Sequence, residues 1–299
     1  MGRVIGILII NFVAILLLLH QHSADAAYKI PSKNSLYSLS TPWEPPQPIT
    51  ENWKNSQSKI NFSPRAQSDF STRDSRLGFI RKVFAIFGTQ MATTIGITYY
   101  IMTNPDISSF LLGHYQHISM ASLIASTGIV FSLVSNPELR YSFPINIILL
   151  GLHTLLQSLI IGTISSLMSP KTVCLGTVHS LAVFAAIALY TFQPNRNFDF
   201  TVLGNTLLAA VTSLGVGSLL NLFFDMPIFD NILYGALAVL FAVYLFHDMS
   251  LIVGGKHRKY KYSQKEYILA ALNLYQDMIG LYMHIINFLK EKEKMASKT

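Results

Sequence analysis

Residues 263–277 read SQKEYILAALNLYQD, and this stretch ends in Asp277, which lies in the middle of the apolar run 266–289. A charged side chain inside a membrane span costs several kcal/mol on insertion, so it is tolerated where a partner or a water-filled cavity meets it. A stripe of polar or small residues surrounds this acid at steps of three and four, and it comprises Asn273, Asp277, Gly280, His284 and Asn287. Residues with this spacing share one helix face. The sequence therefore predicts that this face avoids lipid and that Asp277 belongs to a functional site.

A second acid, Asp248, lies near the end of the preceding apolar run, 235–251, with His247 beside it. Ser263 and Glu266 form a capping box, which predicts where the last helix begins. At about 1.5 Å per residue, Asp277 lies about 20 Å along that helix, a depth similar to that expected for Asp248. The two acids are therefore expected to meet.

The composition indicates a polytopic membrane protein. Of 299 residues, 51% are hydrophobic and only 12% are charged, about half the usual charged fraction of roughly 25%. Apolar runs close to the length of a membrane-spanning helix fall at 83–102, 118–134, 145–167, 173–192, 201–223, 228–253 and 266–289. The expected fold is all-α, a seven-helix transmembrane bundle with a disordered N-terminal tail. The loops are short, so the membrane region itself must hold the function.

Charge and cysteine content exclude several classes of function. The net charge is +7 and the pI is about 9.4, but the basic residues bracket the spans instead of forming one dense face, so no nucleic-acid partner is expected. Cys174 is the single cysteine, which excludes an intrachain disulfide and disfavours a Cys/His metal cluster. The sequence has no H-E-x-x-H or G-x-S-x-G motif. We expect no enzymatic activity, no catalytic residue and no organic cofactor.

The chain divides into four parts. Residues 1–27 resemble a secretory signal peptide, with an uncleaved eighth helix or a misplaced start as alternatives. Residues 28–75 are polar and rich in serine and proline, and are expected to form a disordered tail that acts as a spacer or binds a partner. The membrane domain is expected at 76–290 and a charged tail at 291–299. The positive-inside rule is satisfied through helix six, while the side of both termini stays open.

Several motifs of this chain resemble those of the transmembrane BAX-inhibitor motif family, specifically its Lifeguard branch. The run 263–277 is similar to the signature of the family's final helix and is the most specific of them. Weaker agreements are GFIRKVF at 78–84, Pro-Ile-Asn at 144–146, and Phe-Asp-Phe-Thr at 198–201 followed by Gly204.

The resemblance covers about residues 76–290 and implies a seven-helix calcium leak of the endoplasmic reticulum or Golgi that suppresses cell death, with the plasma membrane as a further location. The family's paired aspartates correspond to Asp248 and Asp277. The chain departs from the family in reading His247-Asp248-Met249-Ser250 where an Asp-Thr-Gln run is usual, and Gln157 where helix three often has glutamate. These departures leave gating and ion selectivity open.

Two carboxylates a few ångströms apart in a low-dielectric site cannot both ionise cheaply, so the pair is expected to titrate as a unit. When both are charged, they offer oxygen ligands that calcium prefers, so Asp248 and Asp277 are the expected proton-sensing and calcium-binding pair. The alternative is that each acid only fixes the bundle by a hydrogen bond. The candidate residues that line a pore or gate are His247, Asn273, His284, Gln157 and His153.

The expected partners are calcium ions, membrane lipids and apoptosis-regulator or channel proteins. Two rival functions stay open. One is a non-conducting scaffold that modulates channels or death regulators. The other is an intramembrane aspartyl protease, although the Gly-x-Gly-Asp run of those enzymes is absent around Asp277. For His153 and Gln157, a hydrogen bond between helices is the alternative to pore lining.

Overall fold

The computed structural model describes residues 73–192, 210, 227–254 and 262–296. These residues form helices and short connections, with no strand among them. The helices are α2 (Arg73–Thr103), α3 (Pro105–Gly113), α4 (Tyr115–Ser135), α5 (Pro137–Tyr141), α6 (Ile145–Ser165), α7 (Pro170–Thr191), α9 (Pro227–Val253), the single 3-10 turn η4 (Gln264–Glu266) and α10 (Tyr267–Ala296). The expectation of an all-α fold is confirmed for this part of the chain.

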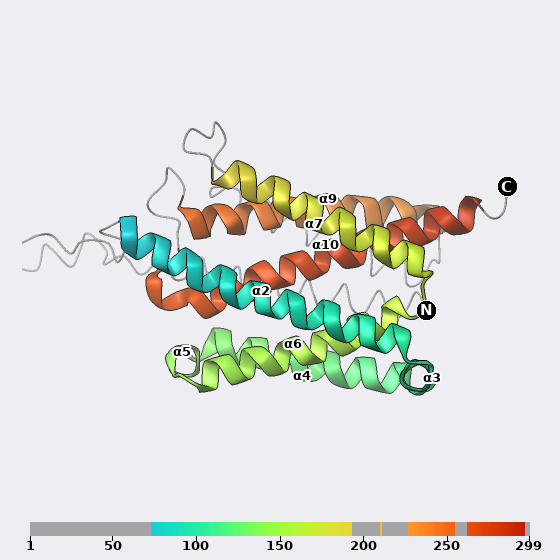
Figure 1. Cartoon of the computed structure of the whole chain (residues 1–299), viewed down its shortest axis with the longest axis horizontal. Coiled ribbons are helices and arrows are strands. Elements are labelled where there is room, and N and C mark those ends of the chain that lie inside the picture. The colour runs from blue at the N-terminus through green and yellow to red at the C-terminus, as the bar shows by residue number, and fades with distance from the viewer. Residues whose placement is uncertain (1–72, 193–209, 211–226, 255–261, 297–299) are drawn as a thin grey trace, which may run out of the picture.

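The helices lie side by side in an elongated bundle with α10 at its centre (Figure 1). In the view of Figure 1, α7 and α9 lie on one side of α10, α4 and α6 lie on the other, and α2 runs along the front. Among the described helices, α9 and α10 have the most extensive packing, and α10 also contacts α7, α2 and α6. Every residue of α10 from Ile268 to Tyr282 is buried. The polar stripe of the last helix therefore faces protein, as the sequence predicts.

Local sequence explains where these helices begin and end. Proline stands in the first turn of α3, α5 and α7, where its missing N–H is not needed. The hydroxyl of Ser169 accepts a 3.2 Å hydrogen bond from the backbone N–H of Thr172 and caps α7. Helix α9 is followed by Gly254 at φ +92°, a conformation that favours glycine. At η4 the side chain of Glu266 accepts a 3.0 Å hydrogen bond from the backbone N–H of Ser263, one half of the expected capping box.

Among the described residues, four helices are long and apolar enough to cross a membrane: α4, α6, α7 and the part of α9 from Ile232 to Val253. The protein is therefore a membrane protein. Six of the seven expected spans coincide with helices, and the seventh, 201–223, lies outside the described residues apart from residue 210. The count of seven stays a prediction. The short helices α3 and α5 lie in loops, where the sequence analysis expected no helix.

Two boundaries differ from those expected. Helix α2 begins at Arg73, inside the segment expected to be disordered through residue 75. Helix α10 continues to Ala296, so most of the charged tail expected at 291–299 is helical. Glu293 stabilises this extension, because its carboxylate accepts a 2.8 Å hydrogen bond from Thr172 of α7. The signal-like segment 1–27 and the tail from 28 to 72 lie outside the described residues.

Candidate functional site

Asp277 lies near the middle of the central helix and is almost completely buried, with an exposed fraction of 1%. Neither of its carboxylate oxygens has a hydrogen-bond partner among the described residues. Buried polar atoms are nearly always hydrogen-bonded, so an unpartnered carboxylate marks a place where a proton, water or cation is needed. Asp277 was also the first candidate in the sequence, and its role stays a prediction.

Asp248 lies on α9, the helix that packs most extensively against α10. Its Oδ1 is 3.1 Å from Nδ1 of His247, and both side chains are buried. The charges of Asp248 and Asp277 lie close enough to repel each other. The two acids of the expected pair therefore lie on helices that pack against each other, but no hydrogen bond joins their carboxylates.

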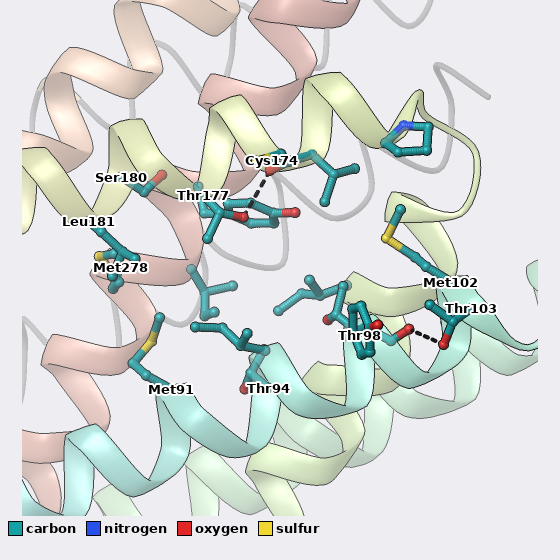
Figure 2. Close-up of a pocket in the computed structure, with 17 residues that line it drawn as sticks. Met91, Thr94, Thr98, Met102, Thr103, Cys174, Thr177, Ser180, Leu181 and Met278 are labelled. Atoms are coloured by element: carbon teal, nitrogen blue, oxygen red, sulfur yellow. Dashed lines mark hydrogen bonds between the residues drawn. The ribbon is translucent and has the colours of Figure 1, made fainter.

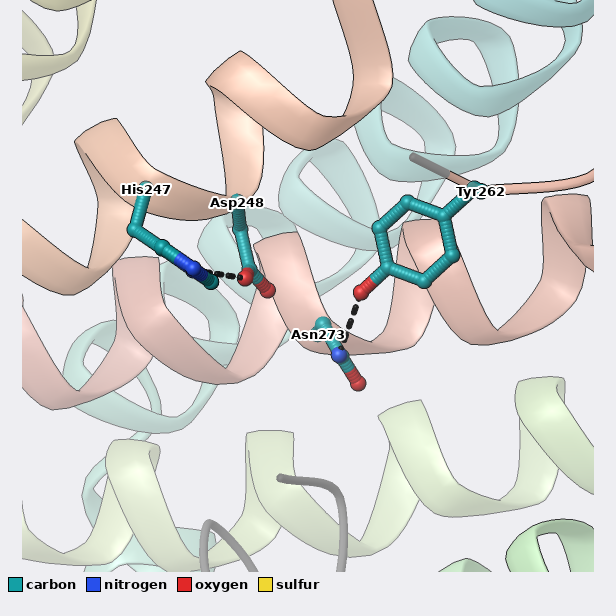
Figure 3. A network of polar contacts seen from close by, with 4 residues as sticks. All are labelled: His247, Asp248, Tyr262 and Asn273. Carbon is teal, nitrogen blue, oxygen red and sulfur yellow. Dashed lines mark hydrogen bonds and ion pairs between the residues drawn. The ribbon is translucent and has the colours of Figure 1, made fainter. Parts of the chain in front are cut away.

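Asn273 and Tyr262 lie near His247 and Asp248 (Figure 3). Nδ2 of Asn273 donates a 2.6 Å hydrogen bond to the hydroxyl of Tyr262, while Oδ1 of Asn273 has no partner among the described residues. Tyr262 precedes η4, outside the span. Its pKa is raised well above the ordinary value by burial first, and then by the charges of Asp248, Glu266 and Asp277. We call His247, Asp248, Tyr262, Asn273 and Asp277 the acid cluster.

His284 lies away from the acid cluster. It follows Asp277 by seven residues, about 10 Å along the helix, and its ring stacks on Phe241 of α9 with the centroids 5.1 Å apart. A second stacked ring, Tyr234, lies 6.4 Å away. Nδ1 of His284 is buried and has no partner among the described residues. Its surroundings are aromatic, so packing between α9 and α10 accounts for its position.

His153 and Gln157 belong to a third group of buried polar residues, on α6. Both contact the hydroxyl of Ser126 on α4: Nε2 of Gln157 donates to it at 3.0 Å, and Nδ1 of His153 lies 2.9 Å from it. All three side chains are buried. These contacts are the hydrogen bonds between helices that the sequence analysis considered as the alternative to pore lining.

A hydroxyl network that was not predicted from the sequence joins three helices. Thr94 of α2 and Tyr275 of α10 share a 2.9 Å hydrogen bond, and Ser158 of α6 donates to Thr94 at 3.1 Å. Nearby, Gln90 donates to Thr154 at 2.9 Å. The signal was present in the sequence as four-residue steps between polar residues inside apolar runs, from Gln90 to Thr94 and from Thr154 to Ser158.

The acid cluster offers oxygen donors that suit calcium. Asp277 has two uncommitted oxygens and Asn273 has one, while Asp248 supplies a second carboxylate. Calcium prefers six to eight oxygen ligands of this kind, so backbone carbonyls or water would complete the set. Among the described residues no group of three or more His, Cys, Asp or Glu side chains gathers as for a transition metal.

Comparison with known proteins identifies the family. The model of the Bax1-I family, described as "Inhibitor of apoptosis-promoting Bax1", matches residues 76–294. This chain belongs to the Bax1-I family. The match contains α4, α6, α7, α9 and α10 almost completely, together with the whole acid cluster.

Relatives of this Bax1-I protein come from a virus, animals and plants. The Golgi anti-apoptotic protein of Vaccinia virus (strain Lister) is 30% identical over 219 residues, which cover 73% of this chain and 87% of the viral protein. Protein lifeguard 3 of Homo sapiens is 29% identical over 240 residues, covering 78% of this chain and 73% of the human protein. Protein LIFEGUARD 4 of Arabidopsis thaliana is 28% identical, covering 73% and 86% of the two chains. The resemblance to the Lifeguard branch is confirmed.

Proposed function

We propose that this Bax1-I protein is a pH-sensitive calcium leak channel of intracellular membranes that regulates calcium stores and suppresses cell death. The names of the relatives support the anti-apoptotic part, since the viral protein is called a Golgi anti-apoptotic protein. The observation that carries the channel part is the unpartnered carboxylate of Asp277, buried in the central helix and facing the charge of Asp248.

In this proposal the acid pair is the gate. Two charged carboxylates repel each other strongly in a low-dielectric interior, so a proton on one of them favours close packing of α9 against α10. Loss of that proton leaves two negative charges on facing helices and loosens the contact. Nδ1 of His247 lies 3.1 Å from Oδ1 of Asp248, so the imidazole is a direct neighbour of the pair.

Calcium is the permeant ion, and it competes with the proton for the same oxygens. The doubly charged pair provides negative charge and hard oxygen ligands, and the uncommitted amide oxygen of Asn273 lies one turn before Asp277. Protonation of one acid removes one of the two negative charges and one oxygen ligand. The leak is therefore expected to fall as pH falls.

The test is calcium flux through the purified protein in liposomes, measured between about pH 5 and pH 8. Asp277→Asn should sharply reduce calcium binding and remove most of the pH dependence. Asp106→Asn is the matched control, because Asp106 is an exposed acid in the first turn of α3. Asp248→Asn is expected to imitate the protonated state and hold one conformation. A pH profile in Asp277→Asn identical to that of the wild type would remove this acid from the mechanism.

The second candidate function is a non-conducting scaffold that modulates channels or death regulators. It would be favoured if the purified wild-type protein gave no calcium flux although it was folded. The proposal includes no enzymatic reaction and no catalytic residue, and a peptide-cleavage assay tests the aspartyl protease alternative. We place the protein in the Golgi or endoplasmic reticulum, with the plasma membrane as the alternative.

A further inference from the structure

A cavity of about 440 Å³ lies between α2, α7 and α10 (Figure 2). Met91, Thr98 and Met102 line it from α2, Leu181 lines it from α7 and Met278 from α10. No member of the acid cluster lines it. The cavity is therefore a separate site, and nothing in the proposed leak mechanism uses it.

The described wall of this cavity is mostly apolar and contains no charged side chain. Its volume is within the range of about 300–1,000 Å³ that holds drug-sized ligands. An ionised group without a partner is very unfavourable in such surroundings, which excludes a fatty-acid carboxylate or a phospholipid head group. Met91, Met102 and Met278 are flexible and polarisable, so they adapt to a rigid apolar ligand. The chemistry of the wall selects a neutral, largely apolar molecule.

Thr98 is a polar residue of the wall whose hydroxyl is not used within the part of the protein that the structure describes. Its side chain is buried, with 8% exposed, and its hydroxyl has no hydrogen-bond partner among the described residues. Threonines in helices usually bond the backbone carbonyl four residues earlier. In α2 the other threonines do so, namely Thr89, Thr93, Thr94 and Thr103. Thr98 departs from this pattern and is left free to bond a ligand.

The other hydroxyls of the wall that are shielded from solvent already have partners in the protein. They belong to Thr94, Thr177, Ser180 and Tyr282. The described wall therefore offers a ligand one buried, uncommitted hydroxyl. A ligand with a single hydrogen-bonding group at one end of an apolar body matches it.

The cavity also has an opening on the side of the bundle. Ile95 and Tyr99 of α2 are 42% and 69% exposed, Leu181 of α7 is 42% exposed, and all three line the cavity. Helix α7 is one of the candidate membrane spans, so this surface faces the hydrocarbon of the bilayer. A ligand consequently enters from the bilayer and not from water.

We propose that the cavity binds one sterol molecule taken from the surrounding bilayer, whose hydroxyl forms a hydrogen bond with Thr98. A sterol is neutral, rigid and apolar and carries one hydroxyl. Long-chain alcohols and diacylglycerols are also neutral and carry a free hydroxyl, but their flexible chains lose more conformational freedom on binding. The site does not depend on the protein conducting calcium.

The first experiment uses the full-length protein in lipid nanodiscs with a photoreactive diazirine analogue of cholesterol. After irradiation, mass spectrometry should find the label on α2 between Met91 and Thr103 and on α7 between Val173 and Leu181. An excess of unlabelled cholesterol should remove it. Label scattered over other lipid-facing helices, or label that cholesterol does not displace, would overturn the proposal. Displacement by hexadecanol or dioleoylglycerol that is stronger than by cholesterol would overturn the assignment to sterols.

Variants then test the role of the cavity. Thr98→Val keeps the shape of the side chain and removes the hydroxyl, so sterol affinity should fall roughly three- to tenfold, as expected for one hydrogen bond. Thr93→Val is the control, because Thr93 lies on the same helix outside the cavity. Met91→Trp should fill the space and abolish labelling. Without sterol, Thr98→Val should not lower Tm, since its hydroxyl has no partner to lose. Equal labelling of wild type and all three variants would contradict the proposal.

Discussion

Asn273 of α10 donates a 2.6 Å hydrogen bond to the hydroxyl of Tyr262, eleven residues earlier in the chain (Figure 3). The backbone carbonyl of Tyr262 in turn accepts a hydrogen bond from Arg76 of α2 at 3.4 Å. Asn273 lies one turn before Asp277. These two contacts therefore connect the start of α2, the entry to α10 and the helix face that carries the acid.

Replacing Tyr262 by phenylalanine should destabilise the protein. The variant leaves the amide N–H of Asn273 buried without its partner, which costs about 1–3 kcal/mol in the free energy of unfolding. The measurement is Tm in detergent. Tyr99→Phe is the matched control, because Tyr99 is 69% exposed, and its Tm should equal that of the wild type. If Tyr262→Phe were as stable as the control, the hydrogen bond between Asn273 and Tyr262 would not contribute to the stability of the protein.

The effect of Tyr262→Phe on Tm should also depend on pH. Burial and three nearby carboxylates raise the pKa of Tyr262 well above its ordinary value of 10.0. The unfolded chain therefore ionises this tyrosine at a lower pH than the folded chain does. Its stabilising contribution is complete below about pH 10 and is lost as pH rises above that value. The Tm difference between wild type and Tyr262→Phe should be constant near neutral pH and shrink above about pH 10. A difference that grows at alkaline pH would contradict this assignment.

Arg76 should be needed to hold the end of α9 in place. Its guanidinium donates to the backbone carbonyl of Leu251 at 2.7 Å, to that of Val253 at 3.3 Å and to that of Tyr262 at 3.4 Å. Burial lowers the pKa of Arg76 to about 10, so the side chain stays charged at neutral pH.

Arg76→Ala leaves these carbonyls unsatisfied and should lower the free energy of unfolding by roughly 1–3 kcal/mol. Arg76→Lys should recover only part of the loss. The ammonium group of lysine is compact and cannot reproduce the planar, forked set of N–H donors of the guanidinium. The exposed Arg81 provides the control, and Arg81→Ala should change Tm little. Equal Tm values for both alanine variants would mean that charge alone, and not these hydrogen bonds, matters at this end of α2.

Ser126 distinguishes the two interpretations of His153 and Gln157. Ser126→Ala removes the hydroxyl that both side chains contact, and should lower the free energy of unfolding by about 1–3 kcal/mol, since two buried groups lose a partner. The pH midpoint of calcium flux should not move if these residues only join α4 to α6. Ser132→Ala is the control, because Ser132 bonds only a carbonyl of its own helix. A shifted midpoint with unchanged Tm would favour pore lining.

Gly176 allows α7 to approach α10 closely. A Cβ at this position would collide with Cγ2 of Ile286, a fully buried side chain of α10. Gly176→Ala should therefore cost about 1–3 kcal/mol through overpacking. Gly151 on α6 has open space around it, so Gly151→Ala should instead stabilise its helix by about 0.5–1 kcal/mol. Opposite signs of the two Tm changes are the expected result, and a stabilised Gly176→Ala protein would contradict it.

Much of the fold follows from local sequence patterns. Hydropathy located six helices of the described bundle, and the steps of three and four residues around Asp277 predicted a buried face before any neighbour was known. Charge content was less informative at the end of the chain. Residues 291–296 look like part of a solvated tail, yet α10 continues through them and the carboxylate of Glu293 accepts a hydrogen bond from Thr172 of α7.

The sequence by itself determined the membrane class, most helix positions and the two acids, because hydropathy, helical periodicity and capping depend on residues close together in the chain. Only the tertiary structure decided which buried groups meet. It paired Asn273 with Tyr262, gave His153 and Gln157 a shared partner in Ser126, and left Thr98 facing a cavity. A helical pattern specifies which face is buried, but the neighbour of that face depends on how separate helices pack, and no local pattern encodes that choice.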